Sequence, residues 1–130
     1  MSAKTPQSDD ILSFDIEGFE VLVGRNARAN DRLSLKVARP RDHWMHVAGV
    51  PGSHVVVRVP SGTDTAPRAV LEAAAQLAIK HSKAAEATGK VAVHHCRAGD
   101  IAKSRGAPTG QVQLRRFETL RVYAPGSGAT

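Results

Sequence analysis

The chain has 130 residues, which is long enough for one domain with a hydrophobic core, and 42% of its residues are apolar. Its single cysteine, Cys96, excludes an internal disulfide framework and a multi-thiolate zinc site, and no apolar run reaches the ~18 residues of a membrane-spanning helix. The formal net charge of +6 favours a polyanionic partner, either nucleic acid or an acidic membrane surface.

The two ends of the chain differ in composition from its middle. Residues 1–12 are polar and rich in Ser, Asp and Gln, which predicts a disordered tail and not a signal peptide. One folded domain is expected over residues 13–124, followed by a short flexible tail over residues 125–130. A chain with one cysteine and neither a leader nor a membrane span is expected in the cytoplasm.

The first predicted elements are a hairpin and a basic helix. Residues 14–24 alternate between apolar and polar side chains on either side of a turn at Gly18, which predicts two paired strands. Residues 25–40 fit an amphipathic helix that is capped by Asn26 or Asn30. Its apolar stripe would consist of Ala29, Leu33 and Val37. A strand that alternates through Leu33, Leu35 and Val37 is the competing interpretation.

The remaining elements are strands around one long helix. Residues 43–47 and 54–59 predict two strands joined by a Pro-Gly turn, and the alanine-rich residues 65–89 predict the clearest helix. The C-terminal part would comprise a strand over residues 91–96, a long polar and cationic connection over 97–110, and one or two strands over 111–123. The predicted fold class is therefore α+β, a largely antiparallel sheet with one long alanine-rich helix and a shorter basic helix.

Five basic residues recur at helical spacing in the first predicted helix. They are Arg25, Arg28, Arg32, Lys36 and Arg39. Spacings of three and four place them on one helix face, and only Asp31 interrupts the basic run. Such a face suits a phosphate backbone, because each phosphate contact releases counterions. A solvated helix face is the alternative interpretation.

The histidines around Trp44 have several interpretations. His43 and His46 would point to opposite faces of a strand. His46 and His54 could meet across the hairpin, but no carboxylate or thiol lies beside them at ligand spacing, so a metal site is not expected. Trp44 and His46 share a face and would form a stacking platform for a base, whereas a core position is the alternative for Trp44. His54 shares its face with Arg58, which suggests a partly exposed polar role.

Two further groups fit ordinary structural roles. Gly52 allows close approach of a ligand, so the amides of Gly52, Ser53 and His54 would reach a phosphate, but a hairpin turn needs Pro-Gly for local reasons alone. His94, His95 and Cys96 occupy consecutive strand positions, so core or edge positions are expected for them in preference to metal ligation.

Four motifs follow one another in a fixed order. They are Gly24-Arg25-Asn26 with Asn30, then Asp42-x-Trp44-x-His46, then Pro51-Gly52-Ser53-His54, and finally Gly110-x-Val112 after an alanine-rich helix that ends near His81 and Ser82. With these motifs the chain resembles the NFACT-R domain over residues 19–124. That domain is the RNA-binding module of ribosome quality-control factors, which include a bacterial alanine-tailing factor and its eukaryotic counterpart.

The resemblance implies a stand-alone, non-enzymatic module that binds tRNA or ribosomal RNA. It implies no cofactor, metal or membrane, and the large ribosomal subunit as a further partner. The tailing activity is not expected without the other domains of those factors. Taken together, the basic residues and the motifs predict the following RNA-binding residues: Arg25, Asn26, Arg28, Asn30, Arg32, Lys36, Asp42, Trp44, His46, Gly52, Ser53, His54 and Arg58. The alternatives are an RNA-processing or nucleotide-processing enzyme that uses His46 and His54 as acid and base, and a protein-binding adaptor on the ribosome.

Overall fold

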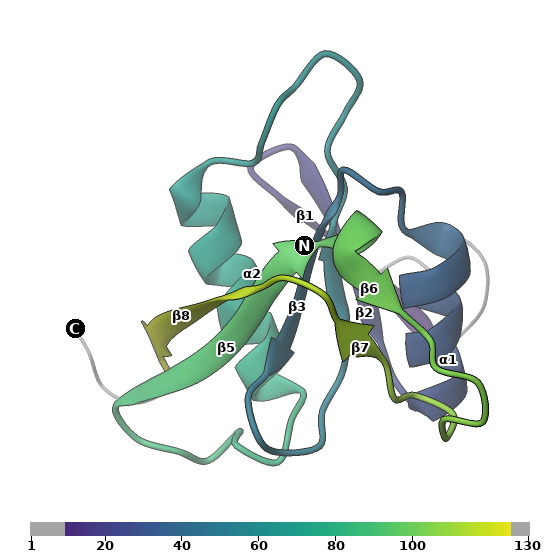
Figure 1. Ribbon diagram of the computed structural model, residues 1–130. Coiled ribbons are helices and arrows are strands. Elements are labelled where there is room, and N and C mark those ends of the chain that lie inside the picture. The colour runs from purple at the N-terminus through teal and green to yellow at the C-terminus, as the bar shows by residue number, and fades with distance from the viewer. Residues whose placement is uncertain (1–9, 126–130) are drawn as a thin grey trace.

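The computed structural model describes residues 10–125, in which six strands form one sheet with helical elements on both faces (Figure 1). The strand order across this sheet is β1-β2-β4-β3-β5-β8, and all neighbouring strands pair antiparallel. The elements are β1 (Ile11–Ile16), β2 (Phe19–Gly24), α1 (Ala27–Arg32), η1 (Leu33–Val37), β3 (His43–Val47), β4 (Val55–Val57), α2 (Arg68–Lys80), β5 (Lys90–Arg97), η2 (Ala98–Asp100), β6 (Ile101–Ala102), β7 (Gln113–Leu114) and β8 (Glu118–Tyr123). The predicted α+β class is confirmed.

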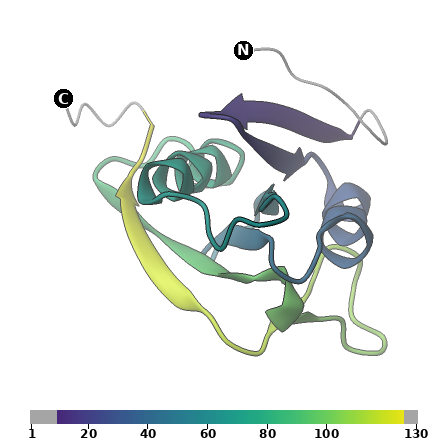
Figure 2. The same ribbon diagram turned by 90° about the horizontal axis from the view of Figure 1, so that it is seen from above.

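Helix α2 packs on one face of the sheet and forms the larger hydrophobic core there. Strand side chains such as Val23, Met45 and Val57 meet Val70 and Ala74 of α2, and all five side chains are fully buried. Because strand side chains alternate with a period of two, every second residue of the central strands reaches this core. In Figure 2, α2 lies between the β1–β2 hairpin and β8.

Helix α1, the η1 turn and the small β6–β7 sheet cover the opposite face. Leu22, Trp44 and Val56 pack here against Leu33 of η1 and Cys96 of β5. Trp44 is 2% exposed. It therefore belongs to the core, as its alternative interpretation held, and its ring is not available for stacking on a base.

The basic segment forms a helix in two parts. Asn26 is the N-cap of α1, and its Oδ1 atom accepts a hydrogen bond from the Ala29 amide at 2.8 Å. The chain then continues as the π-helical turn η1, in which the Ala38 amide donates to the Leu33 carbonyl. Leu33 is fully buried and Leu35 is exposed. The helical interpretation is confirmed, and the competing strand is wrong.

The long helix is shorter than predicted, because α2 ends at Lys80 and not at Gly89. The Ser82 hydroxyl donates to the Ile79 carbonyl at 2.7 Å and closes the last turn. Ser82 then pairs with Gly52 in an isolated β-bridge, and the Lys83 amide donates to the Pro51 carbonyl. Tertiary hydrogen bonds to the turn at residues 51–54 thus override the helix propensity of the alanine-rich segment.

The outer boundaries and the late connection also differ from expectation. β1 begins at Ile11, which is fully buried, so the folded part starts inside the predicted tail over residues 1–12. The rest of the two predicted tails, residues 1–9 and 126–130, lies outside the described residues. The connection after β5 contains η2 and β6, and residues 111–123 supply two strands, β7 and β8. Within residues 10–125, no helix is long and apolar enough to cross a membrane.

Candidate nucleic-acid interface

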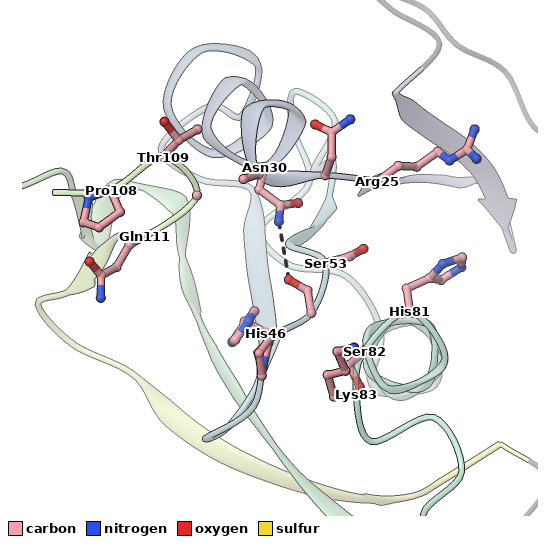
Figure 3. Close-up of a pocket in the computed structure, with 15 residues that line it drawn as sticks. Arg25, Asn30, His46, Ser53, His81, Ser82, Lys83, Pro108, Thr109 and Gln111 are labelled. Atoms are coloured by element: carbon pink, nitrogen blue, oxygen red, sulfur yellow. Dashed lines mark hydrogen bonds between the residues drawn. The ribbon is translucent and has the colours of Figure 1, made fainter.

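The turn at residues 51–54 is attached to α1 through the side chain of Asn30, which is 7% exposed. Its Oδ1 atom accepts from the His54 amide at 3.0 Å, and its Nδ2 group donates to the Gly52 carbonyl at 3.4 Å (Figure 3). Gly24 leaves room for this side chain, because a Cβ atom at Gly24 would lie 2.2 Å from Asn30 Oδ1. Two motifs distant in sequence, Gly24 with Asn30 and Pro51 to His54, therefore form one structural unit.

The amides of this turn are used inside the protein. The Ser53 amide donates to the His81 carbonyl at 3.0 Å, and the His54 amide donates to Asn30. Neither amide is left to bind a phosphate, so the phosphate-cradle interpretation is wrong for these two residues. The turn is instead hydrogen-bonded to α1 on one side and to the end of α2 on the other.

A groove of about 760 Å³ lies beside this turn, and we call it the Arg25 groove. Its basic and imidazole side chains are Arg25, Lys83, His46 and His81. In Figure 3, Arg25 and His81 lie on one side of the groove and Thr109 lies on the other. Of the predicted site residues, the groove brings together Arg25, Asn26, Asn30, His46, Gly52 and Ser53.

A second groove, of about 940 Å³, follows the exposed side of α1 and η1, and we call it the Arg32 groove. Its cations are Arg28, Arg32, Lys36, Arg39 and Arg58. Within residues 10–125 the first four of these side chains form no salt bridge, and the nearby Asp31 carboxylate pairs with Lys103 at 3.1 Å. Thr109 lines both grooves, so they adjoin. The structure thus divides the predicted basic stripe between two connected grooves.

Three buried side chains next to the grooves form a hydrogen-bond chain. The Trp44 Nε1 group donates to Ser34 Oγ at 2.8 Å, and Ser34 Oγ is hydrogen-bonded to His54 Nδ1 at 2.7 Å. Burial, and then the charge of His46, lowers the pKa of His54 to about 4. Burial, and then the charge of His94, lowers the pKa of His46.

His54 is 3% exposed, so the partly exposed position predicted for it is wrong. Its Nδ1 atom is hydrogen-bonded to the buried Ser34 hydroxyl. A general acid or base needs a ring nitrogen within hydrogen-bond reach of its substrate. A buried and internally bonded His54 is thus poorly placed for the role that the enzyme alternative gives it.

Asp42 and Arg58 form an ion pair beneath the Arg32 groove. The Asp42 side chain is 2% exposed, and Arg58 Nε lies 3.0 Å from its Oδ2 atom. The same carboxylate accepts the amides of Arg39 and Val59, both at 2.9 Å. Asp42 is thus occupied within the protein, which leaves no place for its predicted RNA contact. Arg58 is partly exposed and lines the groove.

Comparison with known proteins agrees with this arrangement of motifs. The family described as "NFACT protein RNA binding domain" matches residues 11–116. The chain belongs to this family. The turn at residues 51–54, the Asn30 side chain that holds it and the basic helix are therefore parts of an NFACT RNA-binding domain.

This domain is similar to parts of longer proteins. It is 36% identical to the Rqc2 homolog RqcH of Bacillus subtilis (strain 168) over 105 residues, which cover 81% of the chain and 18% of that protein. It is 32% identical to the ribosome quality control complex subunit NEMF homolog of Drosophila melanogaster over 95 residues, which cover 73% of the chain and 9% of that protein. The chain thus spans less than a fifth of either relative.

A solved structure has the same fold. It is the C-terminal part of the fibronectin/fibrinogen-binding protein from Streptococcus suis. The TM-score is 0.79 at 32% sequence identity, and the match covers 93% of this chain and 47% of that chain. At this identity and coverage the likeness extends over almost the whole domain.

Sequence reasoning missed several residues of the NFACT RNA-binding domain that line the grooves. Lys83, Thr109 and Gln111 reach the Arg25 groove from loops that follow α2 and β6. No spacing within either loop predicts this position, because hydrogen bonds to distant segments create it. The fourth motif includes His81 near the end of the alanine-rich helix, but its place beside Arg25 in the groove follows only from the structure.

A second group of histidines lies on the other face of the sheet. His43 Nδ1 lies 2.9 Å from His95 Nε2, and His95 Nδ1 lies 2.7 Å from the Glu118 carboxylate. The pairing of β3, β5 and β8 brings these residues together from distant positions. Burial, and then the charge of Arg97, lowers the pKa of His43 to about 4. Within residues 10–125, no group of three or more ligand-type side chains is arranged to hold a metal ion.

Proposed function

We propose that this NFACT RNA-binding domain binds tRNA or ribosomal RNA through phosphate contacts along the Arg32 and Arg25 grooves. One observation carries the proposal. Arg28, Arg32, Lys36 and Arg39 line a single groove and, within residues 10–125, have no salt-bridge partner. Cations left without carboxylate partners along one groove suit a polyanion, because binding releases the counterions of each phosphate.

The two grooves together offer a longer path than either alone. They share Thr109, and the Arg25 groove adds Arg25 and Lys83 to the cations of the Arg32 groove. A flexible single-stranded or looped RNA backbone would adapt to both grooves more easily than a stiff duplex. The net charge of +6 supports the same partner by steering a polyanion towards the domain.

The names of the relatives support a place in ribosome-associated quality control. One relative is named a ribosome quality control complex subunit and another an Rqc2 homolog. We propose that this chain acts in the same context as an RNA-binding component. A protein-binding adaptor on the ribosome remains the alternative, and it would not need the cations of the grooves.

The test removes one cation from each groove with Arg25→Ala and Arg32→Ala in one molecule. Binding to tRNA, a structured ribosomal RNA fragment and duplex DNA is measured at several salt concentrations. We expect weaker RNA binding and a plot of log affinity against log salt that is shallower by about 1 to 2. The reason is that binding releases fewer counterions when phosphate contacts are lost.

The control makes the same change of charge elsewhere. Arg68→Ala with Arg121→Ala removes two cations beside α2 and β8, away from both grooves. The control should keep the salt slope of the unchanged domain. Equal effects of the two double variants would mean that only net charge matters. Ribosome association that survives in the groove variant would favour the adaptor.

A further inference from the structure

A third cavity, of about 320 Å³, opens on the α1 side of the sheet, next to the Arg25 groove. Its volume is at the lower end of the ~300–1,000 Å³ typical of small-ligand sites. The lining side chains that matter here are His46, His94, Phe117, Gln111, Val112 and Leu114. The cavity thus has aromatic and imidazole rings on the sheet and a loop as its opposite wall.

The ring wall is built by strand pairing and by the residue before β8. His46 of β3 and His94 of β5 are direct partners across the sheet. The Phe117 ring lies 4.4 Å from the His94 ring between centroids, at an interplanar angle of 48°. Phe117 is nevertheless 48% exposed, so much of its ring has no neighbour. An exposed aromatic ring beside a cavity of planar groups suits a flat, apolar-faced ligand.

The loop wall is held in place before any ligand arrives. Lys103 Nζ donates to the Gln111 carbonyl at 2.8 Å and to the Pro108 carbonyl at 2.6 Å. The same ammonium group pairs with Asp31 of α1. The Gln111 side chain is exposed at the mouth of the cavity, where its amide offers both a donor and an acceptor. A base edge needs this combination for its own donors and acceptors.

The cavity continues into the phosphate-binding region proposed above. His46, Gly110 and Gln111 line both this cavity and the Arg25 groove. In Figure 3, Gln111 lies on the opposite side of the groove from Arg25, and His46 lies between these two sides. Burial lowers the pKa of His46, which favours the neutral ring on which an uncharged base can pack. A nucleotide whose phosphate lies near Arg25 can therefore extend its base towards Phe117.

Building on the RNA binding proposed above, we propose that this cavity takes one unpaired nucleobase of single-stranded RNA, stacked against Phe117 and His94. Bases in a duplex are paired and stacked on their neighbours, so they cannot enter. The cavity would then make the domain prefer loops, ends and single strands to duplexes. Stacking on an aromatic ring accepts any of the bases, and Gln111 would supply a modest preference.

The test compares Phe117→Leu with Phe117→Tyr and with the matched control Tyr123→Leu. Tyr123 is the natural control because it is 47% exposed and lies at the far end of β8. Each protein is titrated with a single-stranded RNA octamer and with the same sequence as a duplex. Phe117→Leu should weaken single-strand binding about five- to tenfold and leave duplex binding unchanged. Phe117→Tyr and Tyr123→Leu should bind like the unchanged domain.

Two further readouts separate this cavity from the phosphate grooves. The salt slope should be the same in Phe117→Leu as in the unchanged domain, because no cation is lost. Fluorescence of Trp44, the chain's single tryptophan, should change with the single strand, because Trp44 lines the cavity, and the change should shrink in Phe117→Leu. Equal single-strand affinity in Phe117→Leu and the unchanged domain overturns the base site alone. Absence of RNA binding by the unchanged domain overturns both proposals.

Discussion

Asn30 and Gly52 show how two residues position the turn at residues 51–54 beside the Arg25 groove. Asn30 reaches from α1 to both ends of the turn, with hydrogen bonds to residues 22 and 24 positions away. Gly52 allows the turn to pack directly against the end of α2, because a Cβ atom there would lie 2.6 Å from the Ser82 Cβ atom. Their place in the family motif therefore has a structural reason.

Gly52→Ala should destabilise the domain by about 1–3 kcal/mol, since the added methyl group overlaps Ser82. Ser82→Gly removes the overlapping atom but also the hydroxyl that donates to the Ile79 carbonyl. Urea unfolding of the two single variants and the double variant measures the coupling between the positions. The double variant should lose about 1 kcal/mol less unfolding free energy than the two single variants lose together. Additive effects would contradict the contact.

Lys103 explains why the connection between β6 and β7 is a defined wall of both the cavity and the Arg25 groove. The sequence predicted a long polar and cationic connection over residues 97–110, and the structure shows that one of its cations, Lys103, points inward to Asp31 and two loop carbonyls. Both members of the ion pair are about three-quarters buried. This cation therefore serves the fold of the element and is not available to RNA.

Lys103→Met should loosen the loop more than it weakens the whole domain. Hydrogen exchange of amides in residues 104–112 should become several-fold faster, because the loop loses its hydrogen bonds to the ammonium group. Global stability should fall by about 1–2 kcal/mol. Lys80→Met, at the exposed end of α2, is the control and should leave exchange in this loop unchanged. Equal exchange in both variants would show that Lys103 does not hold the loop.

The sheet as a whole keeps two sets of histidines apart. His46, His54 and His94 line the cavity on the α1 side, whereas His43 and His95 lie on the α2 side. Alternation along β3 and β5 produces this division, as the sequence predicted for His43 and His46. The domain therefore buries neutral imidazoles on both faces, and its stability must depend on pH.

Acid should destabilise the domain well above the pH at which carboxylates are protonated. His43 and His54 are 2% and 3% exposed, and each has its pKa lowered from 6.5 to about 4 in the folded state. The folded state thus disfavours the charged form, so the stabilisation is complete above pH 6.5 and is lost as the pH falls towards 4. Between pH 7.5 and 5 the loss should be roughly 2 kcal/mol for each histidine.

Urea unfolding at pH 7.5, 6 and 5 measures this dependence. His54→Gln removes one of the two groups and should flatten the curve by about half, although it also changes the bond with Ser34. A curve for the unchanged domain that is flat over this range would show that the two histidines are not buried in their neutral form. If the stability of His54→Gln falls with pH as steeply as that of the unchanged domain, groups other than His54 cause the pH dependence.

Features that depend on short spacings could be predicted from the residues alone. The alternation over residues 14–24 predicted the β1–β2 hairpin, and Asn26 was one of two predicted caps for α1. The spacing of Arg28, Arg32 and Lys36 placed these cations in one groove. Each of these depends on neighbours within one or two turns of helix or one hairpin, so local geometry is sufficient.

Features that depend on contacts between distant segments could not be predicted in this way. Burial of Trp44 and His54 follows from the packing of η1 on the sheet, through the hydroxyl of Ser34. Hydrogen bonds between residues 51–53 and 81–83 determine where α2 ends and place residues 81–83 along the Arg25 groove. Strand register brings His94 beside His46. Composition and short spacings thus determined the charge, the fold class and the basic helix face. The shape of the interface was decided only by the tertiary structure, because no short spacing specifies which distant segments will pack together.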